Sequence, residues 1–186
     1  MGRLLRKPVT WVVVVVVVAG LGVGLALFEP WRVFTHSRVD EPVPAPVAAP
    51  AAPAGSAPAG SAPSASAPAA PPRPVVLAQG EFVSQEHDTS GTARILELPG
   101  GERVLRLEGF ATSDGPDVHV WLSATKAGAD WHAYDDGRYV PLGELKATDG
   151  NHNYAIPAGA DLDGLRSAVI WCDRFNVAFG SAPLST

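Results

Sequence analysis

Hydrophobic and polar positions follow three different patterns along the chain. Residues 9–28 carry no charge, residues 42–74 show no hydrophobic periodicity, and the chain from residue 80 onward contains short apolar runs separated by turn residues. These patterns are typical of a membrane helix, of a segment that builds no core, and of β-strands. They predict four parts: a cytoplasmic basic segment (1–8), a transmembrane signal-anchor helix (9–28), an extracytoplasmic Pro/Ala-rich linker (29–74) and a folded domain (75–186).

The uncharged run is long enough to cross a bilayer as a helix. At about 1.5 Å per residue it spans roughly 30 Å, the thickness of the hydrocarbon core. The valines at 12–18 favour a strand in water, but in lipid a helix satisfies its own backbone hydrogen bonds. Because Arg3, Arg6 and Lys7 precede the run, we expect the N-terminus to lie in the cytoplasm.

A cleaved signal peptide is the alternative interpretation of the same run. Such peptides have an apolar core of about 7–15 residues followed by a small-x-small cleavage site. Here the run is longer, and residues 27–31 read Leu-Phe-Glu-Pro-Trp. We therefore expect a single-pass protein of the cell membrane, with its C-terminal domain periplasmic or on the cell surface.

The segment 42–74 combines Ala and Pro with Ser and Gly. It is predicted to be disordered, because it lacks the apolar residues that a core needs and because proline favours the extended polyproline form. Fully extended at ~3.1 Å per residue, it would reach roughly 100 Å. It is either a spacer that holds the domain away from the bilayer or neutral low-complexity sequence.

The folded domain is predicted to be all-β. Residues 92–98 and 103–107 flank a Pro-Gly-Gly turn and predict a hairpin. Residues 118–122 alternate, with His119 and Trp121 on one face. A long polar stretch, 123–138, is predicted to form loops.

Near the C-terminus, residues 168–172 form the most apolar run and predict a central strand. Residues 175–179 alternate again and predict a further strand. No helical period of ten residues occurs in the domain, so we expect a small sandwich or a barrel-like antiparallel sheet.

Charge narrows the range of partners. The chain has a formal net charge of −5, and from residue 75 onward it carries 8 Lys and Arg against 16 Asp and Glu. An acidic domain argues against a nucleic-acid partner, because phosphates need a basic surface. It also argues against flat docking on an anionic bilayer, so contact with the membrane is expected through the helix alone.

Several residue groups together form a known pattern. They are Gly80-x-Phe82, His87 with Ser90-Gly91-Thr92, Gly115-Pro116-Asp117 leading into Val118-x-Val120-x-Leu122, Leu142-Gly143-x-Leu145, Asn153-Tyr154-x-Ile156-Pro157, and Val169-Ile170-Trp171-Cys172-x-x-Phe175-x-Val177-x-Phe179-Gly180. Over about residues 79–184 the chain resembles the DM-thirteen domain, the "electron-transfer" domain often found beside DOMON domains.

The resemblance implies an all-β extracytoplasmic domain with an electron-transfer role and a redox partner protein. In that family the suspected redox residue is the cysteine after the tryptophan, which is Cys172 here, with Trp171 as its motif neighbour. Position 152 is His where relatives often have Gln. A non-catalytic binding or adhesion module of the cell envelope is the alternative function.

Cys172 is the only cysteine of the chain, so an intramolecular disulfide is excluded. Three roles remain open for it: redox exchange or cofactor ligation, a disulfide with a partner, and an inert buried side chain. Haem or another redox cofactor is compatible with the composition. His/Met haem ligation is excluded, because Met1 is the only methionine.

Metal ligands are a weaker expectation. Asp117 and His119 are two residues apart on a predicted strand, so both side chains lie on one face. His87 is a third candidate ligand. The alternative is that all three are solvated polar side chains. Tyr134, Tyr139 and Tyr154 could carry radicals, but nothing in the sequence distinguishes one of them.

Overall fold

The computed structural model describes residues 8–29, 31–32, 35–44 and 73–185. The predicted helix is confirmed as α1 (Pro8–Phe28), in which the apolar side chains from Val9 onward are exposed. Its span Val9–Phe28 is long and apolar enough to cross a membrane or to serve as a signal sequence. A helix that is apolar all round and not covered by protein suits a lipid environment.

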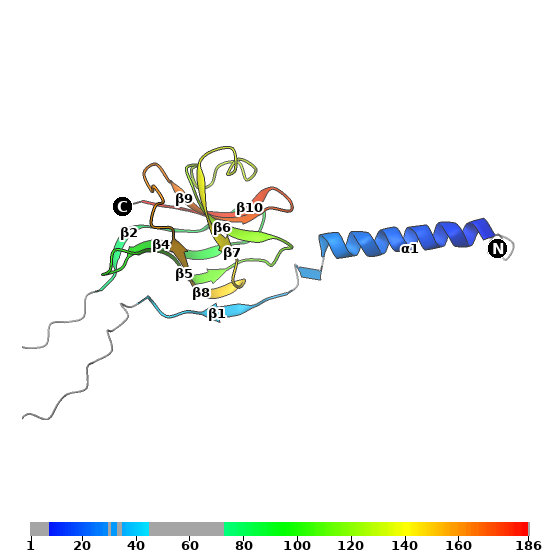
Figure 1. Ribbon diagram of the computed structural model, residues 1–186, viewed down its shortest axis with the longest axis horizontal. Coiled ribbons are helices and arrows are strands. Elements are labelled where there is room, and N and C mark those ends of the chain that lie inside the picture. Colours follow the sequence, from blue (N-terminus) through cyan, green and yellow to red (C-terminus); the bar gives the residue numbers. More distant parts are fainter. Residues whose placement is uncertain (1–7, 30, 33–34, 45–72, 186) are drawn as a thin grey trace, which may run out of the picture.

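The described strands form a sandwich of two five-stranded sheets, which confirms the predicted all-β class (Figure 1). The first sheet has the order β1 (Arg38–Asp40), β8 (Asp149–Ile156), β5 (Arg103–Ala111), β4 (Ser90–Glu97), β2 (Val75–Glu81). The second has the order β3 (Val83–Ser84), β10 (Val177–Pro183), β9 (Ser167–Cys172), β6 (Val118–Ser123), β7 (Tyr139–Glu144). Neighbouring strands are antiparallel except β1 and β8.

The predicted hairpin is confirmed by β4 and β5. Its apolar positions alternate toward the space between the sheets, where Leu105 and Leu107 are fully buried. The turn closes with hydrogen bonds from Leu98 N to Glu102 O (2.8 Å) and from Gly101 N to Leu98 O (2.8 Å). Gly101 has φ 87°, a conformation that glycine adopts without steric cost.

Strand β9 lies in the middle of the second sheet, as its apolar run predicts, and all six of its residues are buried. Its inner face, with Ile170, packs in the core between the sheets. Its outer face, with Trp171, is covered by the 124–138 loop, whose Tyr134 is fully buried against it. Tyr134 Oη donates to Ser181 Oγ at 2.9 Å, which fixes the loop on the sheet.

The strand predicted over residues 175–179 begins later than expected. Strand β10 starts at Val177, and Phe175 lies in the turn after β9 with its side chain 44% exposed. Asn176 has φ 55°, a left-handed conformation that ends the turn and starts the strand. Apolar alternation alone does not distinguish this turn from an extra pair of strand residues.

The range 29–74, predicted as linker, contains β1. This strand pairs in parallel with β8, and Glu41 beyond it accepts from Asn153 N (2.6 Å) and forms an ion pair with Lys146 (2.8 Å). The chain therefore joins the first sheet before it reaches the Ala/Pro segment. Residues 45–72, where disorder is predicted, lie outside the described residues and connect β1 to β2.

The C-terminal end of α1 contacts the turn between β9 and β10. Arg174 Nη1 donates to the carbonyl oxygen of Leu27 at 3.0 Å, and the Phe28 and Phe175 rings stack at 6.1 Å. Both contacts bring the end of the central strand next to the end of the apolar helix.

We predict that Gly150→Ala detaches β1 from the sheet. Gly150 has φ 111°, and an added Cβ would collide with the carbonyl oxygen of Val39. The control is Gly143→Ala at φ 128°, where no atom lies within 4 Å of the added group. Both variants carry the backbone cost of about 1–3 kcal/mol. Hydrogen exchange in residues 35–44 should rise in Gly150→Ala alone, and equal exchange in both variants would contradict this account.

Candidate site around Cys172

Cys172 ends the central strand with a fully buried, unpaired side chain. In the two ladders it lies opposite Val118 of β6 and Val177 of β10. Its side chain belongs to the core cluster between the sheets. The thiol predicted to be the redox residue therefore lies inside the sandwich, not on its surface.

Burial raises the pKa of the Cys172 thiol. Hydrogen bonds from the backbone of Phe175, Arg174 and Asp117 act in the opposite direction and only partly offset that effect. The thiol is thus neutral at neutral pH and a poor nucleophile. The same backbone groups would favour the sulfur if it took on negative charge, as in metal–thiolate sites.

Trp171 lies on the other face of β9, because successive strand residues point to opposite sides. Its ring is buried and stacks on Trp121 of β6 with a centroid distance of 4.9 Å. Trp121 in turn stacks on Tyr139 of β7 at 4.3 Å. The motif neighbour of the cysteine therefore belongs to a row of three aromatic rings on the outer face of the second sheet.

Two of the three predicted metal candidates come together. His119 Nε2 lies 2.8 Å from Asp117 Oδ1 and 3.5 Å from Asp173 Oδ2. Among the described residues these three form the one group with metal-binding spacing, their ligand atoms lying within 4.8 Å of one another. One imidazole and two carboxylates suit zinc or another divalent transition metal. The ion pairs alone also explain the arrangement.

His87, the third candidate ligand, is not in that group. Its ring packs against Phe179 with a centroid distance of 4.0 Å. Burial lowers the pKa of His87, so the ring is held in the neutral form. Its position is that of an aromatic packing residue beside β10.

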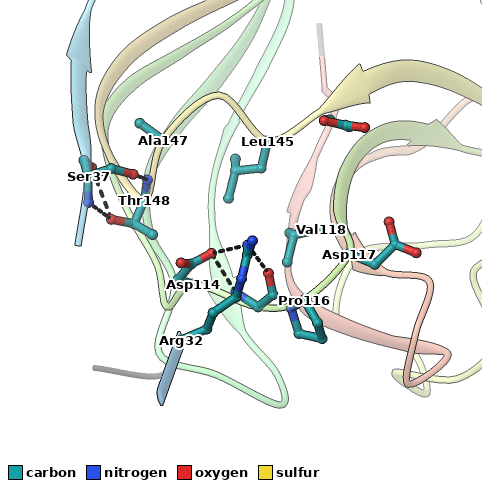
Figure 2. A pocket seen from close by; sticks show the side chains of 11 residues that line it. Arg32, Ser37, Asp114, Pro116, Asp117, Val118, Leu145, Ala147 and Thr148 are labelled. Atoms are coloured by element: carbon teal, nitrogen blue, oxygen red, sulfur yellow. Dashed lines mark hydrogen bonds and ion pairs between the residues drawn. The ribbon is translucent and has the colours of Figure 1, made fainter. Parts of the chain in front are cut away.

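A polar cavity of about 170 Å³ lies next to Asp117, and Figure 2 shows its lining. Arg32 donates to the carbonyl oxygen of Gly115 at 2.9 Å and lies 3.4 Å from Asp114. On the other side Thr148 Oγ1 donates to the carbonyl oxygen of Ser37 at 3.0 Å. These contacts join the segment after α1 to the domain, and Cys172 does not line the cavity.

Sequence reasoning missed two features of the site. Asp173 was not predicted as a ligand, because it approaches His119 through the pairing of β9 with β6. The Trp121–Tyr139 stack was not predicted either, since it joins β6 to a strand beyond a long loop. The face shared by His119 and Trp121 was the signal that pointed to both.

The family described as Electron transfer DM13 matches residues 81–184, more than half of the chain. The chain belongs to the DM13 family. No curated protein and no solved structure matches it.

The DM13 match covers most of both sheets and includes Cys172 and the three stacked rings. Strand β1 and α1 lie outside it. The contacts of β1 with β8 therefore attach a segment of this chain to the outer edge of the DM13 domain.

We predict that the stability of the DM13 domain falls at alkaline pH partly through Cys172. Folding raises the thiol pKa above its ordinary value of 9.0, so this contribution is fully present below about pH 9 and is lost above it. Each pKa unit corresponds to about 1.4 kcal/mol. Urea unfolding between about pH 8 and about pH 10 should show a smaller loss in Cys172→Ala than in wild type.

Tyr154 contributes in the same direction at higher pH, because burial raises its pKa to about 12. The Cys172→Ala variant should therefore keep some alkaline loss of stability. Identical pH dependence in wild type and variant would show that the folded thiol titrates as it does in the unfolded chain.

Proposed function

We propose that this chain is a membrane-anchored electron-transfer protein with Cys172 as its redox residue. Its membership of the DM13 electron-transfer family supports the general activity. The observation that carries the assignment to Cys172 is structural. The only thiol of the chain ends the central strand, one residue after Trp171, whose buried ring belongs to the aromatic row.

The burial of Cys172 limits the chemistry that the thiol can perform. Disulfide exchange requires a second sulfur to reach the first in line, and the side chain of Cys172 has no exposed surface. Transfer of a single electron needs no such contact. Burial also protects the thiol from oxidation to sulfenic and sulfinic acids.

Haem does not fit at Cys172 in this arrangement. The side chain is fully enclosed by the core between the sheets, with no open side for a planar macrocycle. We therefore assign the redox role to the thiol itself. Any other cofactor would need the group of Asp117, His119 and Asp173 beside the end of β9, where His119 lies opposite Trp171 and not opposite Cys172.

The alternative is a non-catalytic binding or adhesion module of the cell envelope. One observation favours it: Cys172 is fully buried and has a raised pKa, as an inert core cysteine also would. In that case Cys172 contributes only packing, and the domain acts through its surface.

We further propose that α1 remains as an uncleaved anchor, with the DM13 domain outside the cytoplasm. The length and apolarity of α1, its basic N-terminal flank and the contacts of its C-terminal end with the domain support this orientation. Protease added to spheroplasts should remove the domain. A domain protected until lysis, or released with its N-terminus near residue 30, would contradict the proposal.

We predict that Cys172→Ser abolishes electron exchange while leaving the fold intact. Burying the Ser hydroxyl in the apolar core should cost about 1–3 kcal/mol of stability, and the hydroxyl cannot be oxidised under the same conditions. The measurement is electron release from the full chain in detergent to a strongly oxidising one-electron chemical mediator, with circular dichroism as the control for folding. Equal release by a folded Ser variant would make Cys172 structural and favour the binding module.

A further inference from the structure

Three aromatic rings cross the outer face of the second sheet in one continuous row. Trp171 stacks on Trp121 at 4.9 Å with an interplanar angle of 26°, and Trp121 stacks on Tyr139 at 4.3 Å with an angle of 16°. The residues come from β9, β6 and β7, which are consecutive neighbours from the middle of the sheet to its edge. The row therefore runs from the interior to the rim.

Exposure changes along the row in one direction. Trp171 is 1% exposed and Trp121 is 4% exposed, whereas Tyr139 is 40% exposed. Tyr134 and Ala178 pack around the inner end and exclude water from it. The outer ring alone is open to solvent and to a partner.

The inner end of the row is covalently next to Cys172. Trp171 precedes the cysteine in the chain, and the two side chains point to opposite faces of β9. Tryptophan and tyrosine rings are, with thiols, the protein groups most easily oxidised by one electron. Near-parallel stacking places their π systems face to face at short range.

We propose that Trp171, Trp121 and Tyr139 form a relay that carries single electrons between Cys172 and an acceptor docked at β7. The inference rests on the proposed redox role of Cys172. The acceptor class is a partner protein with a strongly oxidising, high-valent metal centre, because ordinary metal carriers are too weak as oxidants to take an electron from a tyrosine ring. Because Asp135 and Asp136 are exposed on the loop leading to Tyr139, a partner with a basic docking face suits this edge.

The oxidised acceptor takes one electron from Tyr139, whose phenolic proton passes to water. Trp121 reduces the tyrosyl radical, which regains a proton from water, and Trp171 then reduces the Trp121 radical cation. The Cys172 thiol gives one electron to Trp171, and its proton leaves at the end of β9, where the next residue, Asp173, is exposed to water. One thiol is oxidised to a thiyl radical for each acceptor reduced.

A photo-oxidant attached next to Tyr139 tests the relay in the full chain. Gly137 is a suitable position for Gly137→Cys and a ruthenium polypyridyl label, because its nearest atom to an added Cβ is Thr125 Oγ1 at 3.7 Å. Cys172 is buried and should not react with the label. A light flash in the presence of an external electron acceptor leaves the ruthenium label oxidised. We then expect the optical absorption of a tryptophanyl radical.

The relay predicts which ring substitutions matter. Trp121→Phe keeps an aromatic ring in the stack but should lower the tryptophanyl yield by about an order of magnitude and leave a tyrosyl radical. Tyr139→Phe should slow formation of the tryptophanyl radical. The matched control is Trp131→Phe, since Trp131 is also 40% exposed but is not part of the row. A signal that survives Trp121→Phe, or that depends on Trp131, would overturn the relay.

Cys172→Ser in the labelled protein separates the relay from the role of the thiol. If Cys172 gives an electron to the oxidised row and so removes the tryptophanyl radical, that radical should live longer in the Ser variant. The lifetime of the tryptophanyl radical could instead be unchanged while its yield still depends on Trp121. That result would show that the row conducts electrons, but it would overturn the proposed connection to Cys172. Loss of the relay with intact electron release from Cys172 would overturn the relay and leave the proposed function standing.

Discussion

Burial of β9 on both of its faces is the constraint on which the rest of the domain depends. A strand in the middle of a sandwich is covered on its inner face by the opposite sheet, and here the 124–138 loop covers its outer face as well. Consecutive residues of the strand therefore enter two separate apolar environments. The Trp171-Cys172 pair is divided between them, with the thiol in the core and the indole in the outer cluster.

This division gives the two halves of the motif different surroundings. The thiol is shielded from nucleophilic chemistry by the core, and burial raises its pKa. The indole connects instead to a row of rings that reaches the surface. An electron can pass through such an interior where a reacting molecule cannot, which fits the electron-transfer name of the DM13 family.

Much of the fold could be predicted from local patterns. The hairpin of β4 and β5 follows from two apolar runs around a Pro-Gly-Gly turn, and β9 follows from an unbroken apolar run. The start of β10 was misplaced, since Phe175 continues the alternation although it lies in the turn. Strand β1 was missed because three residues with little apolar character pair through their backbone and through Glu41.

The candidate site was less predictable than the fold. Cys172 follows from the family resemblance, but its complete burial depends on how two sheets pack and has no local signal. Asp117 and His119 share a strand face, as the two-residue period requires. Asp173 joins them only through strand order, and Tyr139 meets Trp121 in the same way. Pairing between distant segments thus decides which side chains meet.

The central claim is that the buried thiol of Cys172 carries the electron. Protein-film voltammetry of the full chain in lipid, wild type beside Cys172→Ser, tests it most directly, because it measures the number of electrons without a chemical partner. The account predicts a one-electron wave in wild type that is absent from the folded Ser variant. A wave of equal size in both proteins, or no wave in wild type, would contradict it.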